Sequence, residues 1–264
     1  MIELVLFETR PDAVRRARAG GIDAGIVDLE WRGKRERQSG ADTEINRDTP
    51  EDLATLAAAG LPRRWCRIEG PGRWTAADLE SVLAAGATDV LLPMVTAPGE
   101  VCALLERLAG RARCGILVET PAAVAGAAEL AELPLDCVYV GLNDLAIGRG
   151  SPHLFTALVD GTVERLRDVF SRVRFGVAGA TRVDRGFPVP SALLLGELAR
   201  LRCDFTFLRR SFKRDVEGCD LGVEVARIRE LWRRLEARSA AAIAGDRERF
   251  LATVEPWLGA RLAR

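Results

Sequence analysis

The chain alternates between short apolar runs and longer amphipathic stretches. The apolar runs carry hydrophobic residues at consecutive positions, and eight of them have the length of a β-strand. Segments with helical spacing lie between them, and several begin with a capping residue such as Thr75 or end with a glycine such as Gly86. This pattern is typical of parallel strands that are buried on both faces by helices. The predicted strands cover residues 3–8, 24–30, 65–70, 88–95, 114–120, 136–144, 174–180 and 204–211.

Eight consecutive strand–helix units predict an α/β fold of the (β/α)8 type, a TIM barrel. The usual length of that fold, ~250 residues, is close to the 264 residues of this chain. The competing architecture is a doubly wound open sheet. When such a sheet binds a dinucleotide it carries G-x-G-x-x-G after its first strand, and no such motif follows residues 3–8. We therefore assign residues 1–240 to the barrel domain.

An additional amphipathic helix is predicted in the C-terminal extension, residues 241–264. Its apolar residues, among them Phe250, Val254 and Trp257, lie mostly at helical spacing. A helix outside a complete barrel must bury its apolar stripe on the barrel itself or on another subunit. We favour a contact between the subunits of a homo-oligomer.

Composition and charge argue against a nucleic-acid-binding, membrane-spanning or secreted protein. Lys and Arg total 38 and Asp and Glu total 38, and we find no basic face of the kind that nucleic-acid binding requires. No apolar run approaches the ~20 residues that cross a bilayer, and the N-terminus does not resemble a secretory signal. The six cysteines are scattered without a C-x-x-C pair, which favours reduced thiols. We expect a cytoplasmic protein that binds neither nucleic acid nor membrane.

Two predicted strands end in a lone carboxylate. Glu119 ends the fifth strand in GILVET, and Asp144 ends the sixth in GLND. The carboxyl ends of barrel strands meet at one rim, so these side chains should be neighbours. Two close carboxylates repel each other unless a proton or a cation lies between them, and their oxygens suit Mg²⁺ or Mn²⁺. The pattern leaves open the alternative that each carboxylate caps the helix after it.

Other strand ends bring further polar and turn-forming residues to the same rim. The guanidinium of Arg67 suits a ligand carboxylate, to which it can donate charge-assisted hydrogen bonds. It could instead pair with Glu69 or another surface acid. The residues at these ends are Asp28 and Glu30 for the second strand, Arg67 for the third, and Pro93 and Met94 for the fourth.

Five segments occur in an order that resembles the HpcH/HpaI aldolase / citrate lyase β-subunit family, over roughly residues 2–215. They are DLE (28–30), CRIEG (66–70), LLPMVTAPGEV (91–101), ILVETPAAV (116–124) and VGLNDLAIGRG (140–150). The resemblance implies a TIM barrel of the phosphoenolpyruvate/pyruvate superfamily. It also implies an enzyme that makes or breaks carbon–carbon bonds next to a 2-oxo acid or an acyl thioester, and a trimeric or hexameric assembly.

The resemblance also implies roles for individual residues. Glu119 and Asp144 match the metal-binding acids, and Arg67 matches the arginine that holds the oxo acid and its enolate. The backbone around residues 141–144 matches the loop against which the ligand carboxylate and the metal's waters lie. The expected substrate-binding residues are Arg67, Pro93, Met94, Gly141, Leu142 and Asn143.

The chain departs from the aldolase branch of that family, which typically has D-G-E-H after strand two with the histidine as acid/base. Trp31 stands at the histidine position. The DLE segment is closer to the citrate lyase and malyl-CoA lyase branch, although the usual second acid of DLED is missing. Glu30, Asp28 or a metal-bound water could move the proton instead. His153, the only histidine, is expected to be a packing or surface residue.

Together these features predict a Mg²⁺- or Mn²⁺-dependent carbon–carbon lyase, aldolase or condensing synthase. It would act through the enolate of pyruvate or oxaloacetate, with an aldehyde or acyl thioester as second substrate. An alternative is a thioester lyase or synthase of the citrate or malyl-CoA type. An alternative of another class is a non-catalytic scaffold that binds a small acid.

The charged stretch 32–50 is long for a loop between a strand and a helix in a barrel. Loops of this length in a compact domain are usually functional or disordered. One hypothesis is that Lys34, Arg35 and Arg37 meet a negatively charged second substrate, and the alternative is a solvated loop.

Overall fold

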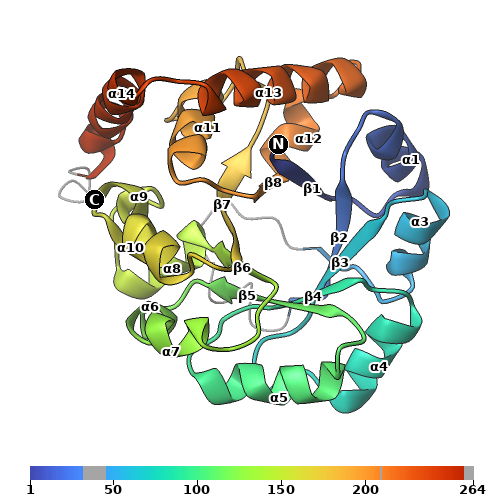
Figure 1. The fold of residues 1–264 in the computed structure, drawn as a ribbon. Helices are drawn as coiled ribbons and strands as arrows, with labels where there is room; N and C mark the ends of the chain where they lie inside the picture. The colour runs from blue at the N-terminus through green and yellow to red at the C-terminus, as the bar shows by residue number, and fades with distance from the viewer. Residues whose placement is uncertain (32–45, 209, 259–264) are drawn as a thin grey trace.

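The computed structural model describes residues 1–31, 46–208 and 210–258. Eight parallel strands form a closed barrel in chain order, with helices around it (Figure 1), so the predicted TIM barrel is confirmed. The strands are β1 (Glu3–Phe7), β2 (Ala24–Asp28), β3 (Arg63–Arg67), β4 (Asp89–Leu92), β5 (Arg113–Val118), β6 (Cys137–Val140), β7 (Arg174–Ala180) and β8 (Phe205–Leu208). The helices are α1 (Pro11–Ala19), α3 (Asp52–Ala58), α4 (Ala76–Ala84), α5 (Pro98–Leu108), α6 (Pro121–Ala125), α7 (Ala127–Ala131), α8 (Leu142–Arg149), α9 (Thr156–Val159), α10 (Thr162–Val169), α11 (Ser191–Arg200), α12 (Arg210–Asp215), α13 (Leu221–Glu236) and α14 (Ala240–Leu258).

The sixth strand is shorter than the sequence predicts. It ends at Val140, and α8 begins at Leu142 immediately after Gly141. Asp144 therefore lies in the first turn of α8 and not at the end of a strand, so that part of the prediction was wrong. A continuous apolar run does not distinguish a buried strand from a buried helix start, which explains the error.

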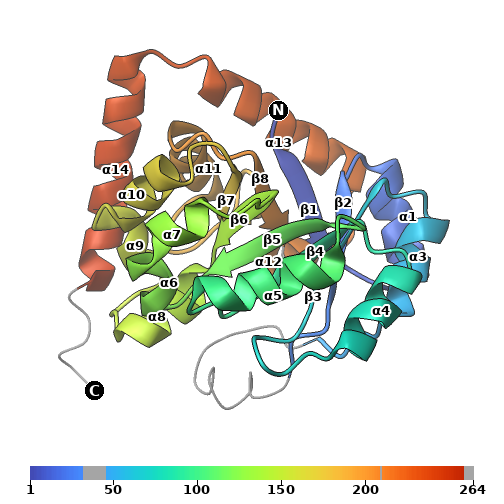
Figure 2. The same cartoon turned by 60° about the horizontal axis from the view of Figure 1, so that its bottom comes forward.

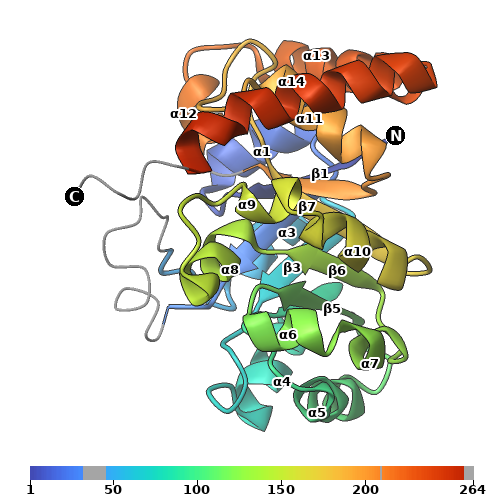
Figure 3. The same ribbon diagram turned by 90° about the vertical axis from the view of Figure 1, so that its left-hand side faces the viewer.

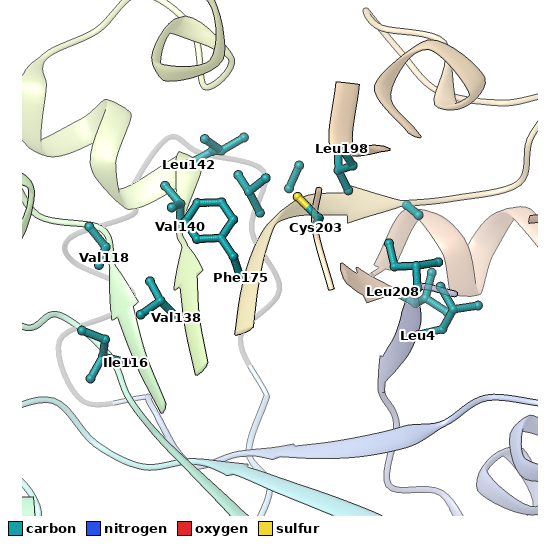
Figure 4. Close-up of a cluster of buried hydrophobic side chains, with 14 of the residues drawn as sticks. Leu4, Ile116, Val118, Val138, Val140, Leu142, Phe175, Leu198, Cys203 and Leu208 are labelled. Carbon is teal, nitrogen blue, oxygen red and sulfur yellow. The ribbon is translucent and has the colours of Figure 1, made fainter. Parts of the chain in front are cut away.

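Side chains along each strand alternate between the inside of the barrel and the helices outside it. The inner side chains form a cluster dominated by aromatic rings, in which Tyr139 stacks on Phe207 with ring centroids 4.0 Å apart. The outer side chains pack against the helices; Ile116, Val138 and Phe175 are examples in Figure 4. This alternation decides which residues at the strand ends can face the barrel's mouth.

Charged residues close the amino-terminal end of the barrel. Arg63 pairs with Glu3 at 2.5 Å and also with Asp89, while Arg174 pairs with Glu3. Arg113 approaches Asp89 at 3.4 Å. Glu3, Arg63 and Asp89 are largely buried and each has an opposite partner, as burial of charge requires, whereas Arg113 is exposed. These ion pairs therefore contribute to the stability of the folded barrel at its amino-terminal end.

Helix α14 packs on its own chain, against α11 and α9 (Figures 2 and 3). Phe250 and Val254 are fully buried there. Arg247 ties the helix to the barrel through Glu197 at 2.6 Å and Glu164 at 2.9 Å. The apolar stripe is thus mostly covered by the barrel itself. Trp257 stays 37% exposed, and the contact with a second subunit stays a prediction.

All six cysteines are free thiols, and four of them are buried. Within the described ranges, none of the helices combines the length and the hydropathy that a membrane crossing demands.

We expect Phe250→Ala to lower the free energy of unfolding by about 3 kcal/mol, because the substitution opens a cavity under α14. Chemical denaturation measures this change. Val223→Ala is the control, since that side chain lies on α13 and is 47% exposed, and it should change stability by less than about 0.5 kcal/mol. Equal effects of the two substitutions would show that α14 is not part of the barrel's folding unit.

Candidate functional site

Three of the predicted site residues face the carboxyl-terminal mouth of the barrel. Asp28 on β2, Arg67 on β3 and Glu119 after β5 each stand two positions beyond an inner core residue of the same strand. The two-residue period of a strand therefore turns all three inward. All are buried, with at most 3% of their surface exposed.

Arg67 is held by a two-pronged ion pair with Asp28. Its Nε donates to Asp28 Oδ1 at 2.8 Å and its Nη2 donates to Oδ2 at 2.6 Å. Glu30 Oε2 lies 3.5 Å from the same Nε. Burial by itself would lower the pKa of Arg67, but the charges of Asp28 and Glu30 outweigh burial and raise it. Arg67 pairs with these residues and not with Glu69.

Glu119 lies against a backbone cradle formed by the ends of β4 and β6. Its Oε1 accepts a hydrogen bond from the backbone N–H of Met94 at 2.9 Å. Met94 adopts a left-handed conformation with φ 56°, which is uncommon outside glycine and marks functional sites. On the other side, a Cβ added to Gly141 would lie 2.2 Å from Glu119 Oε2, so only glycine leaves room for the carboxylate.

The charge on Glu119 is disfavoured in this position. Burial raises its pKa most, and the negative charges of Asp144 and Glu30 raise it further. Arg67 and the Met94 N–H act in the opposite direction but do not compensate. Glu119 and Asp144 are therefore close enough for their charges to repel each other.

The capping alternative for the two carboxylates does not hold. Helix α6 is capped by Thr120, whose side chain accepts from the N–H of Ala123 at 3.0 Å. Helix α8 has Gly141 as its N-cap, without a side-chain cap bond, and Asp144 stands three residues further on. Glu119 is therefore not required for capping, and Asp144 is not a cap residue.

Of the remaining predicted substrate-binding residues, some have side chains in the hydrophobic core and others lie at the mouth of the barrel. Leu142 packs in the outer core (Figure 4), which leaves only its peptide group for a ligand. The side-chain amide nitrogen of Asn143 is buried and has no hydrogen-bond partner among the described residues. Pro93 follows β4 and precedes the strained Met94. Which of them touches a substrate stays a prediction.

The sequence analysis missed Asp48 and Asn46, which border the site. Asp48 Oδ2 accepts a hydrogen bond from the backbone N–H of Asp28 at 2.9 Å. Asn46 Nδ2 donates to Asp28 Oδ2 at 3.4 Å. Burial, together with the charges of Asp28 and Asp52, raises the pKa of Asp48 to about 6. The only signal in the sequence was the length of the charged loop that ends at these residues.

Two other features lie apart from this cluster. His153 is a packing residue: its Nδ1 accepts from the N–H of Phe155, and its ring lies 6.0 Å from that of Trp257. A cleft of about 920 Å³ lies between α1 and α12, beside the end of β1, with Glu8, Lys213 and other residues in its walls. Lys34, Arg35 and Arg37 are outside the described residues, so their predicted contact stays a hypothesis.

The donor set at Glu119 and Asp144 fits a hard divalent cation. Both carboxylates are buried, and a cation would relieve the repulsion that raises the pKa of Glu119. In the described part of the chain, no three His, Cys, Asp or Glu side chains gather into a ready-made metal site. The protein would therefore supply two ligands and leave the rest to water and substrate oxygens, as is usual for Mg²⁺.

The fold and the acidic mouth define a TIM-barrel protein with a polar site at the carboxyl-terminal end of its strands. No protein-family model matches the chain, and no curated protein does either. Solved structures do match it, and the structural neighbours across most of the chain are HpcH/HpaI aldolase / citrate lyase β-subunit family proteins.

Three of these neighbours illustrate the similarity. An HpcH/HpaI aldolase from Desulfitobacterium hafniense is 16% identical, with 86% of this chain and 92% of that chain covered and a TM-score of 0.60. The Mycobacterium tuberculosis citrate lyase β subunit complexed with oxaloacetate and magnesium is 23% identical, with coverages of 88% and 97% and a TM-score of 0.56. Protein CitE of Mycobacterium tuberculosis, in complex with magnesium and pyruvate, is 20% identical, with coverages of 95% and 98% and a TM-score of 0.61. At these identities the likeness shows a shared fold.

We expect Gly141→Ala to destabilise the protein by about 1–3 kcal/mol, because the new methyl group must displace the Glu119 carboxylate. Thermal or chemical unfolding measures the loss. Gly99→Ala is the matched control, since a Cβ there meets no atom within 4 Å, and it should be neutral or slightly stabilising. A neutral Gly141→Ala would disprove the cradle.

We expect Asp48→Asn to stabilise the protein at pH 8, and the gain to shrink as the pH falls from about 6 towards 4. The folded-state pKa of about 6 lies above the ordinary value, so the folded protein holds this proton more tightly than the unfolded chain. The stability that this proton contributes is present at low pH and lost as the pH rises through 6. Unfolding of both proteins across pH 4–8 measures the difference, and a gain independent of pH would contradict the assignment.

Proposed function

We propose that this protein is a divalent-metal-dependent carbon–carbon lyase, or the corresponding condensing enzyme, that acts through the enolate of pyruvate or oxaloacetate. The observation that carries the proposal is the pair of buried carboxylates, Glu119 and Asp144, whose charges interact, with Glu119 also in electrostatic range of the Arg67 guanidinium. The neighbours solved with magnesium and with oxaloacetate or pyruvate have the same fold and support it. The second substrate is an aldehyde or an acyl thioester.

Glu119 and Asp144 would hold Mg²⁺ or Mn²⁺, and the cation would supply Lewis-acid stabilisation of the negative charge that develops on a 2-oxo oxygen. Arg67 would add fixed positive charge beside that oxygen, and its orientation is set in advance by Asp28. Because both oxygens of Asp28 bind Arg67, Glu30 is the better placed of the two proposed acids to move a proton.

The reaction balances as an aldol cleavage of a 4-hydroxy-2-oxo acid. A base removes the proton of the C4 hydroxyl, the C3–C4 bond breaks, and its electrons pass to the 2-oxo group as an aldehyde leaves. The enolate carbon then takes up a proton to give the 2-oxo acid. Condensation with an aldehyde is the same sequence in reverse. With a thioester, the enolate carbon attacks the acyl carbonyl, the C–S bond breaks, and the thiolate leaves and takes up a proton, which gives a 2,4-dioxo acid.

The test is exchange of the methyl protons of pyruvate in D₂O, measured with Mg²⁺ and with a chelator. We expect exchange that depends on Mg²⁺, is lost in Glu119→Gln, and falls about 100-fold in Arg67→Lys, which keeps the charge but loses the planar fork. Glu80→Gln is the matched control, because Glu80 is an exposed acid paired with Arg111, and it should exchange like the wild type.

The same experiment separates the alternatives. Pyruvate binding without exchange in the wild type would favour the non-catalytic scaffold. Exchange that survives the chelator or Glu119→Gln would contradict the metal-dependent mechanism. Oxaloacetate or pyruvate offered with aldehydes and with acyl thioesters would then identify the second substrate.

A further inference from the structure

The end of β2 lacks a strand partner on one side, and Asp48 replaces it. Strand β1 pairs with β2 only as far as Phe7 and Ile26, whereas β3 continues to the pair of Asp28 with Arg67. The backbone N–H of Asp28 donates to Asp48 Oδ2 at 2.9 Å. An acid twenty positions further along the chain therefore completes the hydrogen bonding of β2 at the mouth.

Asp28 orients Arg67. The hydrogen bond from the backbone N–H of Asp28 to Asp48 therefore affects Arg67 indirectly, through Asp28 alone. Both oxygens of Asp28 accept from Arg67, and Oδ1 also accepts from the N–H of Glu30 at 3.3 Å. On its other side, Asp48 Oδ1 accepts from Thr9 Oγ1 at 3.4 Å. The hydrogen bonds thus run from the end of β1 through Asp48 and Asp28 to Arg67.

The hydrogen bond from the backbone N–H of Asp28 does not require a negative charge on residue 48. An asparagine could accept the same backbone hydrogen bond without a charge. The carboxylate instead lies half-buried, with the acids Asp28 and Asp52 facing it and the Cys66 thiol nearby. Burial and these two acids raise its pKa to about 6, so ionised Asp48 costs stability at neutral pH.

What the charge adds is a stronger hydrogen bond. An ionised carboxylate accepts a shorter and stronger bond from an N–H than a neutral acid or amide does. The stronger bond holds the end of β2 in place, and with it the Asp28 carboxylate that both Arg67 nitrogens need. Loss of stability at a site that gains rigidity is a common trade-off in functional regions.

We propose that Asp48 is a positioning residue of the site: through the backbone N–H of Asp28 it holds Arg67 ready for an anionic ligand, and it does so best when ionised. The role of Asp48 in activity rests on the proposed function. The structural coupling of Asp48 to Arg67 does not depend on that function. Because the contact is indirect, Asp48 is not assigned a direct part in the chemistry.

The activity test compares Asp48→Asn and Asp48→Ala with the wild type in Mg²⁺-dependent proton exchange of pyruvate, from pH 5 to 8. We expect the wild-type kcat/KM to fall below about pH 6. Asp48→Asn should lack this decline and stay within about threefold of the wild type at pH 8. Asp48→Ala should be about tenfold lower at every pH, mainly through KM, because a misplaced Arg67 weakens ligand binding.

Thr9→Val is the control, since it removes a 3.4 Å bond to Asp48 and leaves the bond to Asp28 in place. It should keep the decline but move its midpoint to higher pH, because the Thr9 bond lowers the pKa of Asp48. A merely structural role for Asp48 would lower the unfolding temperature without changing the pH profile. The proposal is wrong if Asp48→Asn keeps the decline near pH 6, or if folded Asp48→Ala keeps the wild-type KM and kcat.

A second readout does not depend on activity. In protein labelled with ¹⁵N-arginine, the Nε–H signal of Arg67 is identified by its loss in Arg67→Lys. We expect this signal to shift with a midpoint near pH 6 in the wild type and to stay constant in Asp48→Asn. A wild type without proton exchange would refute the proposed function alone, whereas an Arg67 signal that behaves identically in the two proteins would refute the coupling.

Discussion

The buried ion pair between Arg67 and Asp28 is the interaction on which the mouth of this barrel depends. Both side chains are out of water, where an unpaired charge would cost roughly several kcal/mol. Two hydrogen bonds in the plane of the guanidinium satisfy this requirement and fix its direction. Asp28 is thereby neutralised, whereas burial and the charges of Asp144 and Glu30 raise the pKa of Glu119.

Buried charges are arranged differently at the two ends of the barrel. At both ends, the alternation of side chains along the strands turns the charged residues inward. At the amino-terminal end, Glu3 lies between Arg63 and Arg174, so every charge of that group meets an opposite one. At the carboxyl-terminal end, the pKa of Glu119 is raised by burial and by Asp144. The raised pKa of Glu119 thus lies at the end at which barrels of this class carry their sites, whereas ion pairs satisfy the buried charges of Glu3, Arg63 and Asp89 at the other end.

The sequence was sufficient for the fold and for part of the site. Consecutive apolar positions located all eight strands, and the ends of the third and fifth predicted strands put Arg67 and Glu119 near the carboxyl-terminal rim, where the structure has them. It could not locate Asp48, because that contact depends on where a long loop returns to the barrel and not on any local pattern. The start of α8 was also missed, since an apolar run has the same composition in a buried strand and in a buried helix.

The charges at the mouth also bear on how a carboxylate ligand could bind. An anion that enters alone meets the acids of β5 and α8, while Arg67 already has Asp28 as its partner. Its attraction to Arg67 is then offset by repulsion from Glu119 and Asp144. A divalent cation held by those two acids would cancel their negative charge and remove that repulsion. Under the proposed function, a 2-oxo acid would use its two adjacent oxygen-bearing groups to bind that cation and Arg67 together.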